Sequence, residues 1–208
     1  AALTDSTIML GLSGPQAEEA LTESGLPCPT GALATASQDD TTVIHLDGSR
    51  YVIVAQESAM ATLWQKLTVK ARPAGNAAWR WLDIQAAYPL VTLATKEEFV
   101  PQMADFEKIG GVSFHKGCYP GQEVVARTQY LGKVKRHLYR LSSPQALKAG
   151  DALHSPDNPD QSCGMVMTAA PSPAGGYEAL AVVQSNYSTN VHLGALEGPA
   201  VQAIAVNP

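Results

Sequence analysis

The Asp47-Gly48 dipeptide constrains the fold more than any other feature of the sequence. It lies between two runs rich in β-branched and aromatic residues, at residues 42–46 and 50–55. An Asp-Gly pair between two such runs is a strong signal for a tight β-hairpin, because the turn needs residues that tolerate positive φ angles. We therefore expect two adjacent antiparallel strands, around which the first half of the chain packs.

Segments on both sides of the hairpin predict an α+β layer. An apolar run at residues 7–12 is followed by Pro15 and a helical pattern that ends near Ser24. After the hairpin, apolar residues recur at helical spacing over residues 58–69, and residues 79–84 fit either a strand or a helix. The order strand, helix, strand, strand, helix predicts a ferredoxin-like split βαβ layer, with two helices over one antiparallel sheet.

The pattern of the sequence changes after Lys133. Short apolar runs separated by Pro, Gly, Ser and Asn follow at residues 138–141, 164–168, 179–183 and 201–206. Such runs are typical of a small barrel or sandwich, and we predict a C-terminal antiparallel β-barrel. The predicted domains are therefore residues 1–132 and residues 133–208.

Composition excludes several classes of protein. With 45% hydrophobic and 16% charged residues, 208 residues suffice for one large core or two small ones. No stretch approaches the roughly 20 apolar residues of a membrane helix. The three cysteines are far apart and odd in number, which suggests neither a disulfide framework nor a metal site. A cytoplasmic location is expected, without a membrane partner.

Positive charge is concentrated in one stretch, although the net charge is −5. Five basic residues fall within fourteen positions, namely Arg127, Lys133, Lys135, Arg136 and Arg140. They form either a solvated strand face or an anion-binding strip. We favour the first interpretation, because the net negative charge disfavours nucleic acid.

A glycine-rich segment around Cys118 is the strongest candidate for a functional site. Gly117 and Gly121 permit backbone conformations that other residues resist, so Cys118 is expected on a tight, exposed turn. A short helix is predicted over residues 122–127. Its dipole and the neighbouring Lys116 both favour a thiolate. A buried, inert cysteine is the alternative, and the sequence leaves both open.

Two other chemistries fit Cys118 less well. A lone cysteine cannot hold zinc or a cluster, which need about three or four ligands. The only nearby partner is His115, three residues before Cys118, and it would point to the opposite side of an extended chain. A Cys-His hydrolase pair would need one of the five histidines, and nothing selects one. A permanent metal site is not expected, whereas transient coordination of a partner's cluster stays open.

The residues around Cys118 match a family signature. The run KGCYPGQEVVAR, preceded by FVPQ and IGGVSFH and followed by YLGKVKR, resembles that of the YgfZ-type proteins, relatives of the glycine-cleavage aminomethyltransferase or T-protein. The resemblance implies a tetrahydrofolate-binding fold, a role in assembling or repairing iron–sulphur clusters, including those of tRNA-modifying enzymes, and a requirement for Lys116, Cys118 and Glu123. The other motif residues are Gly117, Tyr119, Gly121, Gln122 and Arg127.

The resemblance also implies a folate site, in which this sequence differs from the family pattern at one position. T-protein relatives bind the pterin of folate through a glutamate, and Gln85 stands at the matching position. A carboxylate can accept two hydrogen bonds, whereas an amide donates at one end. Gln85 is therefore either an altered pterin contact or a polar residue at a strand end. Trp81, Tyr88 and Gln102 complete the predicted cofactor residues. Since family members begin well before Ala1, the chain is expected to be a fragment.

Three functions are consistent with these observations. The favoured one is a folate-dependent factor for iron–sulphur clusters that acts through Cys118, with cluster enzymes or assembly proteins as partners. The second is tetrahydrofolate-dependent aminomethyl transfer, which needs an acidic group near the pterin, so Gln85 argues against it. The third is direct tRNA binding through the basic stretch, with Tyr130 or Tyr139 stacked on a base.

Overall fold

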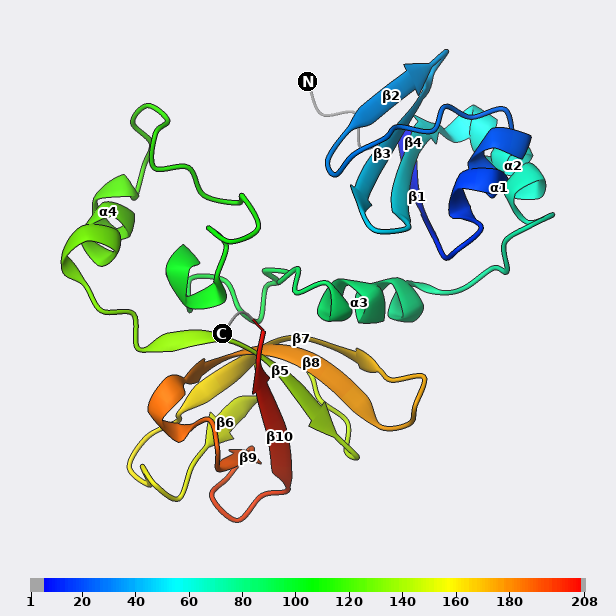
Figure 1. Cartoon of the computed structure of the whole chain (residues 1–208). Coiled ribbons are helices and arrows are strands. Elements are labelled where there is room, and N and C mark those ends of the chain that lie inside the picture. Colours follow the sequence, from blue (N-terminus) through cyan, green and yellow to red (C-terminus); the bar gives the residue numbers. More distant parts are fainter. Residues whose placement is uncertain (1–5, 207–208) are drawn as a thin grey trace. The chain divides into compact units, whose positions relative to one another are not determined.

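The computed structural model describes residues 6–206, which divide between two compact units. The units comprise residues 1–74 and residues 75–208. The first contains β1 to α2, and the second contains α3 to β10 (Figure 1). The boundary that we predicted between residues 132 and 133 lies inside the second unit, between α4 and β5. The division into domains at residues 1–132 and 133–208 stays a prediction.

A four-stranded antiparallel sheet forms the centre of the first unit. Its order is β1-β4-β3-β2, with bounds Thr7–Ser13 (β1), Thr35–Gln38 (β2), Thr41–Asp47 (β3) and Arg50–Gln56 (β4). The predicted hairpin joins β3 to β4, and Gly48 in its turn has a φ of 49°. Both β1 and β3 run antiparallel to β4, which lies between them. They are therefore parallel to each other, as in the predicted split βαβ unit.

Two helices cover one face of this sheet, as predicted. They are α1 (Ala17–Glu23) and α2 (Glu57–Leu67). Leu21 of α1 and Leu67 of α2 share a core with Tyr51, whose ring is fully buried on β4. The apolar residues of the two helices recur at three- and four-residue spacing, so each helix turns one stripe toward the sheet.

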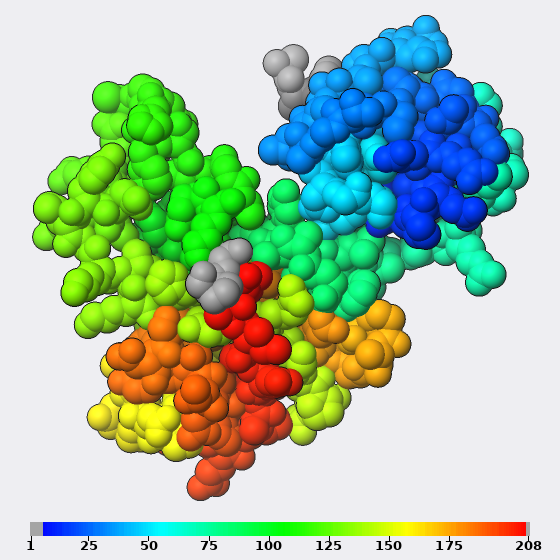
Figure 2. Space-filling view, viewed as in Figure 1, coloured from blue at the N-terminus to red at the C-terminus, as the bar shows by residue number. Residues whose placement is uncertain are grey.

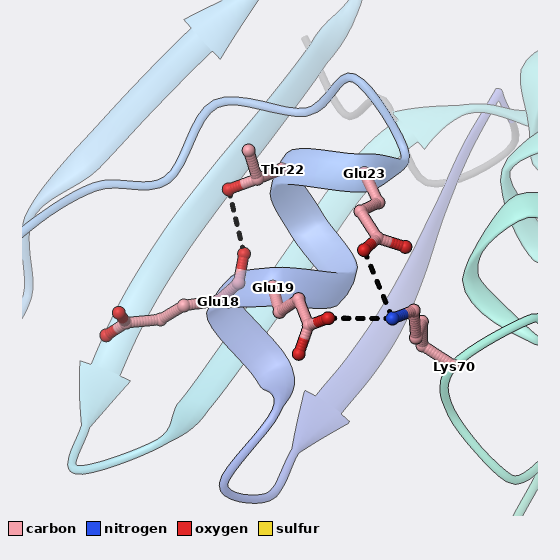
Figure 3. A network of polar contacts seen from close by, with 5 residues as sticks. All are labelled: Glu18, Glu19, Thr22, Glu23 and Lys70. Carbon is pink, nitrogen blue, oxygen red and sulfur yellow. Dashed lines mark hydrogen bonds and ion pairs between the residues drawn. The ribbon is translucent and has the colours of Figure 1, made fainter.

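Lys70, just beyond α2, ties the two helices of the first unit together. Its Nζ lies 2.7 Å from Glu19 Oε1 and 3.1 Å from Glu23 Oε1, and both carboxylates belong to α1 (Figure 3). The hydrogen bond from Lys70, followed by its charge, lowers the pKa of Glu19. These groups are in contact with water, so the network orients the helices and adds little stability.

Six strands of the second unit form a closed antiparallel barrel, which confirms the predicted barrel. The order is β10-β5-β8-β7-β6-β9. The bounds are Arg136–Ser143 (β5), Ala152–His154 (β6), Gly164–Pro171 (β7), Tyr177–Gln184 (β8), Val191–Leu193 (β9) and Ala200–Ala205 (β10). A short 3-10 helix, η2 (Ser185–Tyr187), follows β8. Alternate strand residues such as Leu141, Ala181 and Val183 fill the interior without exposure.

Helical elements cover part of the outer face of the barrel. Ile84 of α3 (Asn76–Gln85) and Ala104 of the 3-10 helix η1 (Pro101–Ala104) pack on Leu180 of β8 in one buried cluster. Because Leu180 alternates with interior residues, β8 is buried on both faces. Residues 79–84, which fitted a strand or a helix, are helical. They belong to the barrel unit and add no strand to the first sheet.

Candidate functional site

Cys118 lies on an exposed turn immediately before α4 (Gln122–Leu131). The helix begins at the predicted residue, after Gly121, whose φ of 83° favours glycine. The turn is closed by a reciprocal pair of hydrogen bonds. The N–H of Gln122 donates to the Tyr119 carbonyl at 3.2 Å, and the N–H of Tyr119 donates to Gln122 Oε1 at 3.2 Å. The sulphur is therefore presented to solvent, and the alternative of a buried cysteine is wrong.

Charged side chains of the motif surround this turn. The Nζ of Lys116 lies 4.6 Å from the centre of the Tyr119 ring, a distance that allows a cation–π interaction. Glu123 is exposed in the first turn of α4, where the helix dipole favours negative charge. Residues 6–206 contain no group of three His, Cys, Asp or Glu residues that could hold a metal ion. The motif thus offers one sulphur flanked by one cation.

The 3-10 helix η1 anchors α4, the helix that follows the Cys118 turn and that we call the motif helix. Gln102 is 2% exposed, and its Nε2 donates to the carbonyl oxygen of Val125, the buried residue of α4, at 2.7 Å. The other amide atom, Gln102 Oε1, is buried without a partner among the described residues. Gln102, a predicted cofactor residue, therefore directs its amide N–H to the motif helix.

A second polar cluster gathers at the end of α3. Gln85 lies at a helix end, so its predicted position at a strand end is wrong. Its Nε2 donates to Glu178 Oε2 on β8, and its backbone carbonyl accepts a bond of 2.9 Å from Arg140 Nη2. Ser172 Oγ donates to the other oxygen of Glu178 at 2.7 Å. The buried indole nitrogen of Trp81 makes no hydrogen bond of ordinary geometry within the described structure.

The environment of Glu178 favours its charged form. Burial by itself raises the pKa of Glu178, but the combined effects of Ser172, Trp81, Gln85 and the charge of Arg140 outweigh it and lower the pKa. The indole N–H of Trp81 lowers the pKa of Glu178 through its dipole, although it makes no hydrogen bond that meets the usual geometry. The cluster therefore holds a carboxylate where the sequence suggested only an amide.

The predicted cofactor residues fall into two groups. Trp81 and Gln85 both act on Glu178, whereas Gln102 contacts α4. Tyr88 is half-buried just after α3. The sequence did not suggest Glu178, because it lies 93 positions from Gln85 and no local pattern links the two.

Four of the five basic residues line one groove beside α4. The groove has a volume of about 740 Å³, and we call it the basic groove. Its lining residues are Met103, Val124, Arg127, Thr128, Leu131, Gly132, Lys133, Val134, Lys135, Arg136 and Gln184. Of the two predicted stacking residues, Tyr130 is 70% exposed, but Tyr139 is buried inside the barrel and cannot stack on a base.

Comparison with known proteins decides the family. The tRNA-modifying protein YgfZ of Sodalis glossinidius is 37% identical to this chain over 154 residues, which is 73% of the chain. The chain is a YgfZ homologue. YgfZ of Hamiltonella defensa is also 37% identical, over 143 residues, and that of Yersinia pestis is 34% identical over 137 residues. These matches cover 45%, 43% and 42% of the relatives, so the chain spans less than half of their length.

Structural comparison identifies a solved structure with a similar fold. The glycine cleavage system aminomethyltransferase T of Bartonella henselae superposes on 97% of this chain and 58% of its own, with a TM-score of 0.70 and 20% identity. The T-protein-like fold predicted from the motif is thereby confirmed. No family model matches the chain. Over residues 6–206, no helix is long and apolar enough to cross a membrane.

Proposed function

We propose that this chain carries the thiol site of a factor that assembles or repairs iron–sulphur clusters, with Cys118 as the reacting group. The observation that carries the proposal is the exposed sulphur on a turn closed by Tyr119 and Gln122. The name of the relatives, tRNA-modifying protein, supports clients among enzymes that modify tRNA. A cytoplasmic setting suits the proposal, because thiols stay reduced there.

An exposed thiol suits transient contact with a cluster carried by another protein. Cys118 would replace one ligand of the client's cluster: its thiol loses a proton to solvent, its sulphur–iron bond forms as one client ligand–iron bond breaks, and the released ligand takes up a proton. The other ligands stay with the client, because clusters need about four. Lys116, held against Tyr119, would place a positive charge next to the anionic cluster. Glu123 and Arg127 complete the motif on the exposed side of α4.

Tetrahydrofolate is the cofactor that the family implies. Glu178 supplies a carboxylate that could accept hydrogen bonds from its pterin ring. A pterin edge presents N–H donors, for which a carboxylate is the matching acceptor. Glu178 accepts one bond at each oxygen, from Gln85 and Ser172, and retains lone pairs for further donors. The residues therefore fit a pterin, and we propose that Trp81, Gln85 and Glu178 would hold it. When bound, tetrahydrofolate supplies one-carbon chemistry.

The second candidate function is aminomethyl transfer, which the T-protein-like fold favours. It would need an acidic group poised near the substrate amine. Formation of methylenetetrahydrofolate and ammonia from an aminomethyl thioether and tetrahydrofolate, lost in Glu178→Gln, would support this function. Cys118 has no part in such a reaction, so Cys118→Ala would leave it unchanged.

The cluster function is tested by replacing Cys118 in the protein as it occurs in the cell. Cys118→Ala should lower the activity of cluster-dependent tRNA-modifying enzymes to that of cells without the protein. Cys28→Ala is the matched control, because Cys28 lies outside the motif in the first unit. Normal client activity with folded Cys118→Ala protein would contradict the proposal.

A further inference from the structure

We propose that the basic groove binds an unpaired RNA strand. The groove lies within the second unit. It is formed by α4, the segment that joins α4 to the barrel and the first residue of β5, with Met103 of η1 and Gln184 of β8. It is lined by neither Cys118 nor Glu178. The inference therefore goes beyond the cluster function and does not depend on it.

The groove concentrates positive charge without neutralising it. Arg127 comes from α4, Lys133 and Lys135 from the joining segment, and Arg136 from the start of β5. None of these four cations forms an ion pair with a residue of the described range 6–206, and no Asp or Glu lines the groove. An uncompensated cationic groove attracts an anion, although the whole chain carries a net charge of −5.

The four cations come from successive parts of the chain, so they form a strip and not a single cluster. Lys133 and Lys135 are exposed, and the segment that carries them, yellow-green in Figure 2, protrudes on the face shown there. A strip of separate cations matches successive phosphates of a strand better than it matches one compact ion. Fixed positions for Arg127 and Arg136, on a helix and a strand, give the strip a defined geometry.

Apolar and aromatic groups border the same cations. Met103, Val124 and Leu131 contribute apolar surface to a groove of about 740 Å³, a volume typical of ligand sites. Tyr130 precedes Leu131 in α4; it is not itself a lining residue, but it is 70% exposed and so is available to a base beside the groove. Cationic grooves with an aromatic platform are the usual means of binding single-stranded nucleic acid. In a duplex the bases are already stacked, so Tyr130 would gain nothing.

Fluorescence anisotropy with a short labelled unpaired RNA oligonucleotide tests the proposal on the whole chain. If all four cations contact phosphates, the slope of log K against log salt is about −2.8, and raising salt from about 50 to about 200 mM weakens binding about 50-fold. Lys133→Glu/Lys135→Glu should abolish at least half of that slope. Tyr130→Ala should weaken binding by about tenfold with little change in slope.

A matched control separates the groove from overall charge. Lys96→Glu/Lys148→Glu reverses two exposed lysines outside the groove, so both double variants have the same net charge. Only the groove variant should lose affinity. Both should keep the wild-type circular dichroism spectrum, because all four lysine side chains are exposed.

Three results would overturn the inference. They are the absence of RNA binding at low salt, equal loss of affinity in the two double variants, and displacement of the RNA by polyglutamate at equal charge concentration. The last result would assign the groove to acidic polypeptides. A blunt-ended RNA duplex without unpaired nucleotides should compete poorly, and equal competition would refute the role of Tyr130.

Discussion

Replacing Gln102 with leucine should loosen α4 and leave the barrel intact. Gln102 is buried in η1, and its amide donates the 2.7 Å hydrogen bond to the carbonyl of Val125. Leucine keeps the apolar part of the side chain and removes that donor. Since α4 follows the Cys118 turn directly, its docking determines how firmly the motif is held.

The magnitude follows from how little else holds α4. The helix has 10 residues, and isolated helices shorter than roughly 12–15 residues are only marginally stable in water. Val125 is its buried residue. Loss of the bond costs about 0.5–1.5 kcal/mol. The Val125 carbonyl is not left unsatisfied, because it lies inside α4 and still accepts from the backbone N–H four residues further on. Leucine also removes Gln102 Oε1, a buried acceptor without a partner, which offsets part of that cost. A net loss of about 1 kcal/mol, or about fivefold more undocked helix, is expected.

Hydrogen exchange measured by mass spectrometry checks this prediction. Amides of α4 should exchange about fivefold faster in Gln102→Leu, while those of β8 should not change, because local opening does not require global unfolding. Gln129→Leu makes the same chemical change on the exposed side of the helix and should have no effect. Unchanged exchange in α4, or equal acceleration in β8, would refute the anchoring role of Gln102.

Three further predictions concern reactivity, packing and pH. An aromatic disulfide reagent should label Cys118 in the folded protein and the fully buried Cys163 only after denaturation; rapid native labelling of Cys163 would contradict the barrel core. Leu180→Ala should lower the free energy of unfolding in urea by about 2–5 kcal/mol, because Leu180 has no exposure, and a smaller loss would mean that the site collapses. Since the folded-state pKa of Glu178 is lowered from 4.5, its stabilising effect is present above pH 4.5 and is lost as the pH falls through the lowered value. Glu178→Gln should flatten the acid dependence of unfolding, and an unchanged pH profile would contradict this account.

Local signals were sufficient to predict most of the first unit. The hairpin at Asp47-Gly48 and the helices on either side depend on turn chemistry and on apolar spacing, both of which are visible in short windows. Strand β2, Thr35–Gln38, could not be predicted, because its sequence TASQ lacks apolar alternation. It forms through pairing with β3, at positions such as Ala36 and Val43. Helix α3 fitted two assignments until the packing of Ile84 on the barrel decided between them.

The candidate site shows the same division between local and distant information. The helix start after Gly121 and the exposure of Cys118 follow from neighbouring residues. The partners of Gln102 and Gln85 lie 23 and 93 positions away, so no pattern in the sequence indicates them. In the sequence, the five basic residues lie in one stretch and cannot be told apart by their position. Folding separates Arg140, which donates to the Gln85 carbonyl, from the four that line the basic groove.

Strand β8 belongs to two cores at once, and this governs how the second unit can come apart. Ala181 and Val183 complete the barrel interior, while Leu180 and Val182 complete the layer beneath α3 and η1. A fragment that began at residue 133 would retain the barrel strands but expose that second apolar layer to water, and large exposed apolar patches promote aggregation. The cover formed by α3 and η1 should therefore melt together with the barrel in a single calorimetric transition.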